Sequence, residues 1–131
     1  MSVEKQTPAV LVVDDEEMNR MIITTLLENT LGVKSEAVVS GEEAILHFKK
    51  RIEAHEELYK LIVMDINMPV LDGKETTKAL RKMIASMKVE PKPEVRIIAH
   101  TAMPASQLGN FKQEGFDDFV HKTSTLKGLK Q

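Results

Sequence analysis

The stretch Leu61–Asp65, with the sequence LIVMD, decides the fold: four apolar residues end in one carboxylate. A continuous apolar run this short is typical of a strand buried on both faces of a sheet. Ala9–Val13 and Val95–Ala99 have the same character. Val33–Val38 and Asp118–Val120 are further short runs rich in β-branched residues. The sequence therefore predicts five strands.

Segments with helical periodicity separate these runs. In three of them, apolar side chains recur at the i, i+3, i+4 spacing of one helix face. The predicted faces are Met18, Met21, Ile22, Thr25 and Leu26; then Ala44, Ile45, Phe48 and Ile52; then Thr76, Ala79, Leu80, Met83, Ile84 and Met87. Strand–helix alternation of this kind predicts a doubly wound α/β fold, with a parallel sheet covered on both faces.

The predicted helix starts have local signals. Ser40 with Glu43, and Asp72 with Glu75, have the spacing of capping boxes for the second and third helices. Two later helices have weaker signals. One is predicted from Pro104 to near residue 115, and a short last helix after residue 124 is cut off by the C-terminus.

Length and composition limit the class of protein. The 131 residues predict a single domain, 1–131, with a core at about residues 9–125. A net charge of −2 gives no reason to expect direct nucleic-acid binding or an anionic membrane surface. No run approaches the roughly 20 apolar residues that span a bilayer, and the N-terminus lacks a secretory pattern. Without cysteine, thiolate metal sites are excluded, and a cytoplasmic location is predicted.

Chemically useful groups follow four of the predicted strands: the pair Asp14-Asp15, then Asp65, Thr101 and Lys122. Because the carboxyl ends of parallel strands meet at one edge of a sheet, we expect these groups to converge. Each also has a purely structural interpretation. The acidic residues could cap helices, the threonine could serve a turn, and the lysine could be solvated. Their convergence favours function.

Three carboxylates in one small site repel each other and are stabilised by a hard divalent cation. Oxygen-only ligands favour Mg²⁺ or Mn²⁺ over zinc. Lys122 offers a mobile positive charge and Thr101 a hydroxyl donor, which are the groups that phosphoryl oxygens require. The residues alone thus indicate a metal-assisted phosphoryl site.

Four stretches resemble the response-regulator receivers of two-component signalling, the chemotaxis-regulator-like phosphoacceptor domains. They are Leu11–Asp15, Met64–Gly73, Thr101-Ala102 and Gly115–Lys122. The resemblance extends over nearly the whole chain. It implies a flavodoxin-like sheet of order 2-1-3-4-5.

The resemblance also implies roles for the residues of the metal site. Asp65 would attack a phosphohistidine and become an aspartyl phosphate. Asp14, Asp15 and Asp65 would bind Mg²⁺, joined by the backbone carbonyl of Asn67. Such a domain catalyses only its own phosphorylation and dephosphorylation, and is not otherwise an enzyme.

A second group of roles concerns the phosphoryl oxygens and the switch. By resemblance, Lys122, Thr101 and the backbone N–H of Ala102 would contact the phosphoryl group. Thr101 and the aromatic Phe119 would move when it is attached. Phe119 is also open to interpretation as an ordinary core residue. Thr123 stands where the family usually has proline, which alters the loop after Lys122.

The implied partner is a histidine kinase or a histidine phosphotransfer protein, with the chain itself a monomer or weak dimer. Two alternatives stay open. One is a receiver-like interaction module that is never phosphorylated. The other is a haloacid-dehalogenase-like phosphatase, which is disfavoured because Asn67 stands where that family has a second acid. Outside the site, His47 and the run Lys49–Arg51 are predicted to be solvated, and His100 to be packed.

Overall fold

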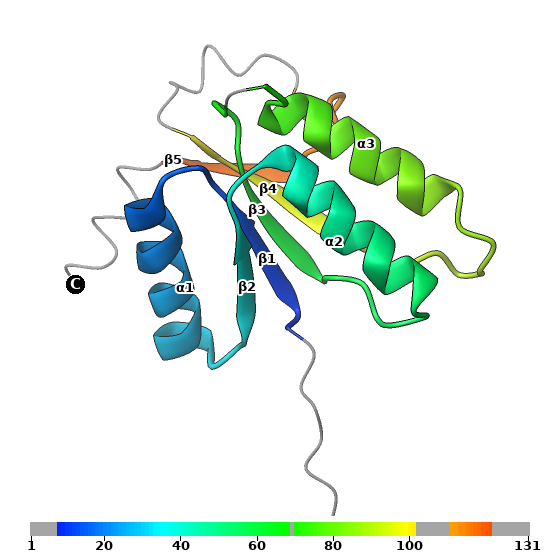
Figure 1. Ribbon diagram of the computed structural model, residues 1–131, viewed down its shortest axis with the longest axis horizontal. Coiled ribbons are helices and arrows are strands. Elements are labelled where there is room, and N and C mark those ends of the chain that lie inside the picture. Colours follow the sequence, from blue (N-terminus) through cyan, green and yellow to red (C-terminus); the bar gives the residue numbers. More distant parts are fainter. Residues whose placement is uncertain (1–7, 69, 102–110, 122–131) are drawn as a thin grey trace, which may run out of the picture.

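The computed structural model describes residues 8–68, 70–101 and 111–121. Its strands are β1 (Val10–Val13), β2 (Ser35–Val38), β3 (Leu61–Asp65), β4 (Arg96–Thr101) and β5 (Asp118–His121). Its helices are α1 (Glu17–Leu31), α2 (Gly41–Glu53) and α3 (Gly73–Ala85). All strand pairs are parallel, and the sheet order is β2-β1-β3-β4-β5, as predicted (Figure 1).

The strand bounds agree closely with the prediction except at β2 and β4. β2 begins at Ser35, and β4 extends through His100 to Thr101. The extension follows from pairing: His100 lies opposite Asp65 of β3, and Thr101 lies opposite His121 of β5. Ladder partners, more than apolar composition, therefore set the end of β4.

The helices cover the sheet from both sides (Figure 1), with α2 and α3 on one face and α1 on the other. Side chains of a strand alternate between faces, so Leu11 and Val13 join the larger core beside Phe48 of α2 and Leu80 of α3. This core has the apolar faces that periodicity predicted for α2 and α3. Phe48 is fully buried, and truncating such a residue typically costs about 3–5 kcal/mol.

The predicted face of α1 is wrong. Met18 and Met21 are 71% and 62% exposed, and the helix instead buries Ile23 and Leu27 against β1. The first helix carries two overlapping apolar stripes, and only one can face the sheet. Burial selects the stripe that meets Val10 and Val12. Of the other stripe, Met18, Met21 and Thr25 are exposed, and Ile22 and Leu26 are half-buried.

Both predicted capping boxes have their N-cap bonds. The Ser40 hydroxyl accepts from the Glu43 N–H at 3.1 Å, and the Asp72 carboxylate accepts from the Glu75 N–H at 2.8 Å. Each cap is followed by a glycine that has no room for a side chain. A Cβ at Gly73 would lie 2.2 Å from the Asp65 carbonyl oxygen. The start of α3 is thus set directly against the end of β3.

Most of the predicted fourth helix, and all of the fifth, lie outside the described residues. The last five positions of the fourth, 111–115, form turns and not a helix. The turn ends at Gly115, whose φ of 105° suits glycine. Among the described residues, no helix has the length and apolar character needed to cross a membrane.

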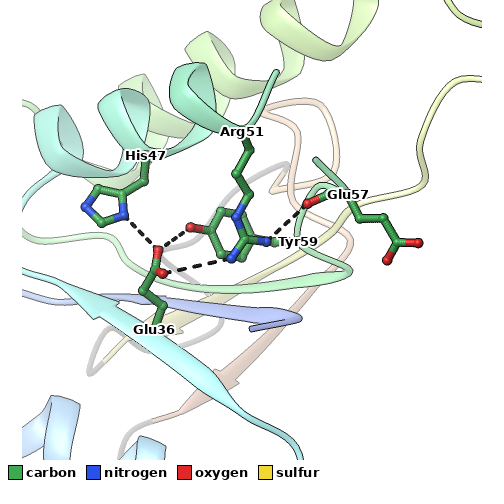
Figure 2. Close-up of polar contacts among 5 residues, drawn as sticks. All are labelled: Glu36, His47, Arg51, Glu57 and Tyr59. Atoms are coloured by element: carbon green, nitrogen blue, oxygen red, sulfur yellow. Dashed lines mark hydrogen bonds and ion pairs between the residues drawn. The ribbon is translucent and has the colours of Figure 1, made fainter. Parts of the chain in front are cut away.

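A polar cluster joins β2 to α2 and to the segment before β3 (Figure 2). We call Glu36, His47, Arg51 and Tyr59 the Glu36 cluster. One Glu36 carboxylate oxygen accepts from the Tyr59 hydroxyl and bonds to Nδ1 of His47 at 2.7 Å. The Arg51 guanidinium lies 3.6 Å from the Tyr59 ring centre and 3.9 Å from the second Glu36 oxygen. It also donates to the Glu57 carbonyl oxygen at 3.2 Å.

The Glu36 cluster corrects two predictions. Arg51 is buried, and His47 is half-buried and bonded, although both were predicted to be solvated. Burial by itself raises the pKa of Glu36, but the Tyr59 and His47 hydrogen bonds and the Arg51 charge outweigh it, so the pKa is lowered. Burial and the bond to Glu36 raise the pKa of Tyr59, which keeps its hydroxyl a donor.

Candidate metal centre

Three carboxylates meet at the carboxyl edge of the sheet. Asp14 and Asp15 follow β1, and Asp65 ends the neighbouring β3, where Met64 lies opposite Val13. One carboxylate oxygen from each lies within 4.8 Å of the other two. Asp14 and Asp65 are buried, while Asp15 is exposed. A group of three acids at this spacing fits a hard divalent cation, because the cation offsets their mutual repulsion. The predicted convergence of these acids is confirmed.

Three hydrogen bonds hold Asp14. Its N–H donates to the Val38 carbonyl oxygen of β2 at 3.2 Å, and its carboxylate accepts from the Glu16 N–H at 2.9 Å. Its carbonyl oxygen accepts from Nη1 of Arg20 in α1 at 2.8 Å. One oxygen of Asp14 thus makes a local turn bond to Glu16, the N-cap residue of α1. This bond does not explain why Asp65, from another strand, shares the site.

Sequence reasoning missed Arg20. It is the only basic residue of α1, and this was the signal available. Its contact spans six positions of the chain, so no helix-face or capping pattern indicates it. The bond exists because the chain turns between β1 and α1 and brings the first turns of the helix back beside Asp14.

Two backbone hydrogen bonds hold the segment after Asp65. The Met68 and Gly73 N–H groups both donate to the Ile66 carbonyl oxygen, at 3.2 and 2.9 Å. Asn67 lies between Ile66 and Met68 and is exposed. Val70 has a φ of 68°, a left-handed conformation that is unfavourable for a β-branched residue, and its side chain is 91% exposed. A strained, exposed apolar residue therefore follows the strand-end acid.

The next strands bring further predicted residues to the same edge. Thr101 ends β4 and is fully buried, and His100 is buried as predicted. Phe119 of β5 is half-buried against the larger core, and its ring meets that of Phe111 edge to face at 5.2 Å. Its interpretation as a core residue is thus correct for this conformation. Lys122 and Ala102 lie outside the described residues.

The family model of the response regulator receiver domain matches residues 10–131. The chain belongs to this family. Receivers are the phosphoacceptor domains of two-component signalling, and this is therefore the function class of the chain. The predicted family and the predicted flavodoxin-like fold are both confirmed.

Relatives include sensor kinases and a two-component response regulator. The chain is 32% identical over 130 residues to the sensor histidine kinase GacS of Pseudomonas protegens, covering 99% of this chain but 13% of that protein. It is 33% identical over 119 residues to two-component response regulator 24 of Arabidopsis thaliana, covering 91% of this chain and 76% of that protein. The chain thus spans a small part of the kinase and most of the regulator.

Solved structures agree with this assignment. The receiver domain of the histidine kinase CKI1 from Arabidopsis thaliana, complexed with Mg²⁺ and BeF₃⁻, matches with a TM-score of 0.74 and 28% identity. The match covers 94% of this chain and 89% of that one. The chemotaxis protein CheY4 of Vibrio cholerae matches with a TM-score of 0.69 and 27% identity, over 92% and 94% of the two chains.

Proposed function

We propose that Asp65 is the phosphoacceptor of this receiver and that the site works with Mg²⁺. One observation supports this above the others: Asp65 ends the central strand β3, buried, with its carboxylate within 4.8 Å of the carboxylates of Asp14 and Asp15. A carboxylate held beside two further acids can act as a nucleophile only when their charge is neutralised. We therefore assign the neutralising cation and the nucleophile Asp65 to the same site.

The proposed reaction is a phosphoryl transfer from a phosphohistidine. A carboxylate oxygen of Asp65 attacks the phosphorus, an O–P bond forms, and the P–N bond breaks. The electron pair of the broken bond stays on the imidazole nitrogen, which takes a proton from water so that neutral histidine is released. The products are an aspartyl phosphate and a free histidine. Hydrolysis of the aspartyl phosphate restores Asp65, so the domain modifies only itself and is not an enzyme acting on a separate substrate.

Mg²⁺ would be held by Asp14, Asp15, Asp65 and the backbone carbonyl of Asn67. The donor set is oxygen only, which suits Mg²⁺ and also Mn²⁺. When bound, the cation supplies charge neutralisation for the incoming phosphoryl oxygens and alignment of donor and acceptor. Asp14 and Asp15 would hold the cation from the end of β1, and Asp65 from the end of β3.

Thr101, Lys122 and the Ala102 N–H are proposed to contact the phosphoryl oxygens from the other side. The position of Thr101 at the end of β4, next to β3, supports its part in this. A hydroxyl drawn toward the new phosphoryl group would leave space behind it. We propose that Phe119 follows Thr101 inward and loses its ring contact with Phe111. This movement would carry the signal.

The phosphoryl donor is proposed to be a histidine kinase or a histidine phosphotransfer protein in the cytoplasm. The kinship with kinase-borne receivers supports this choice of partner. Met18 and Met21 lie exposed on the first turns of α1, directly after the acidic pair, and Val70 lies exposed after Asp65. Exposed apolar side chains beside a reactive group suit a protein partner. We further propose that residues 1–131 form one domain.

The test is the intact mass of the protein after incubation with acetyl phosphate and Mg²⁺. The wild type is expected to gain one phosphoryl group, and EDTA is expected to prevent it. Asp65→Asn should gain none. Asp118→Asn makes the same chemical change at an exposed acid on β5 and should behave as the wild type. Equal phosphorylation of Asp65→Asn and the wild type would refute Asp65 as the acceptor.

A further inference from the structure

Arg20 connects α1 to the acidic pair without being one of the acids. Its side chain is half-buried, and Nη1 donates to the Asp14 carbonyl oxygen at 2.8 Å. We propose that Arg20 is a positioning residue that orients Asp14 and Asp15 toward one cation and so sets the Mg²⁺ affinity of the site. This inference rests on the proposed function, in which these acids hold Mg²⁺.

The argument begins with the peptide that joins the two acids. The Asp14 carbonyl belongs to the Asp14–Asp15 peptide group, which is planar and rigid. A hydrogen bond that fixes the direction of this carbonyl fixes the plane itself. The plane in turn determines where the Cα atoms of both acids direct their side chains. Arg20 therefore acts on both carboxylates through one atom.

Two further bonds of Asp14 act on other groups than this plane. The N–H of Asp14, held by Val38 at 3.2 Å, belongs to the preceding peptide group. The bond from the Glu16 N–H to the Asp14 carboxylate, at 2.9 Å, holds the side chain of Asp14. Asp15 is exposed, so packing restrains it little. Of these bonds, the one from Arg20 holds the link between the two acids.

Charge and geometry act in opposite directions here. The guanidinium is always ionised, so it offsets repulsion among the acids without a cation but opposes a cation that binds nearby. Loss of the charge alone would strengthen Mg²⁺ binding, whereas loss of the orienting bond weakens it. Residues that orient metal ligands typically contribute about 10–100-fold to affinity. We therefore expect about a tenfold weakening when Arg20 is removed, at the lower end of that range.

Two substitutions separate these effects. Arg20→Gln removes the charge and shortens the side chain, so the bond to Asp14 is lost. Arg20→Lys keeps the charge and offers an N–H donor of similar reach, so it should restore Mg²⁺ affinity to within about threefold of the wild type. Arg96→Gln is the matched control. It makes the same charge change at an exposed position at the start of β4, the opposite end of that strand from Thr101.

The experiment is a calorimetric titration of the full chain with Mg²⁺, for the wild type and the three variants. Urea unfolding without metal gives the stability of each variant. The rate of phosphorylation by acetyl phosphate is measured as a function of Mg²⁺ concentration. We expect Arg20→Gln to bind about tenfold more weakly and to need correspondingly more Mg²⁺ for half-maximal phosphorylation. The maximal rate at saturating Mg²⁺ should stay within about twofold of the wild type, because the nucleophile is untouched.

Different outcomes overturn different statements. If the wild type binds no Mg²⁺, the proposed function fails and the role of Arg20 fails with it. If the wild type binds and Arg20→Gln binds equally well or more tightly, only the positioning role is overturned. Reduced resistance to urea with unchanged Mg²⁺ affinity would likewise overturn it, since Arg20 would then be a structural tie between α1 and β1.

Discussion

Removal of the Tyr59 hydroxyl tests how much its hydrogen bond to the Glu36 carboxylate stabilises the fold. In Tyr59→Phe, the buried ring stays but its hydrogen bond to the Glu36 carboxylate is lost. A hydrogen bond to a charged group contributes about 1.5–3 kcal/mol. The Glu36 side chain is 31% exposed, so water can replace part of the bond. We therefore expect a loss near the lower end, about 1.5 kcal/mol at pH 7.

This loss corresponds to a measurable shift in melting temperature. For 131 residues, an unfolding entropy of about 2.1 cal/mol/K per residue sums to about 0.28 kcal/mol/K. A loss of about 1.5 kcal/mol then lowers the melting temperature by about 5 °C. Urea unfolding followed by far-ultraviolet circular dichroism gives the free energy directly, and this probe suits a chain without tryptophan.

The same substitution has a predicted pH dependence. The pKa of Glu36 in the folded chain lies below its ordinary value of 4.5, because the donors and Arg51 outweigh the opposing effect of burial. A lowered folded pKa stabilises the fold above the unfolded pKa, and this stabilisation is lost as the pH falls through the folded pKa. The difference between wild type and Tyr59→Phe should therefore be largest near neutral pH and shrink as the pH falls below 4.5.

Either of two results would refute this reasoning. One is a destabilisation under about 0.5 kcal/mol at pH 7, which would make the hydroxyl energetically neutral. The other is a difference that stays constant as the pH falls. As a control, Tyr59→Phe should have a smaller effect in a Glu36→Ala background, since the hydroxyl acts through that carboxylate.

Two further predictions concern the backbone near the site. Gly73→Ala should destabilise the chain by about 3 kcal/mol in urea unfolding, because its Cβ would meet backbone atoms of Asp65 and Ile66 at 2.2 and 2.8 Å. Gly32→Ala, in open space but at a φ of 64°, is the control at about 1 kcal/mol, and equal effects would contradict the steric argument. Val70→Asn should stabilise the chain by about 0.5–1 kcal/mol, since asparagine tolerates a φ of 68° better than valine. A destabilisation of that size in the same assay would contradict it.

Local signals in the sequence predicted local structure well. Strand β3 has its predicted bounds because a four-residue apolar run ending in Asp65 admits few other structures. Both predicted N-cap bonds formed because an N-cap side chain and its partner N–H are three residues apart. The convergence of Asp14, Asp15 and Asp65 followed from strand direction alone once the sheet was taken as parallel.

Features that depend on distant partners were missed. Arg51 was predicted to be solvated because its neighbours are lysines, yet Glu36 and Tyr59 bury it. No short window contains all three residues. The wrong face of α1 has a related cause: both apolar stripes satisfy the periodicity, and the choice between them depends on β1. Arg20 escaped notice because its partner is a backbone atom, which leaves no mark on the sequence.

The sheet order has a mechanical consequence for signalling. Strands β1 and β3, which carry the acids, each have a hydrogen-bonded neighbour on both sides, whereas β5 forms an outer edge. Within the described sheet, the acids are thus held by strands that are hydrogen-bonded on both sides, whereas β5 is bonded to β4 alone. Phe119 lies on β5. With Phe119 as the proposed readout, the reaction would take place on inner strands and the response on an outer strand, so the surface of the domain could change without disturbing the three acids.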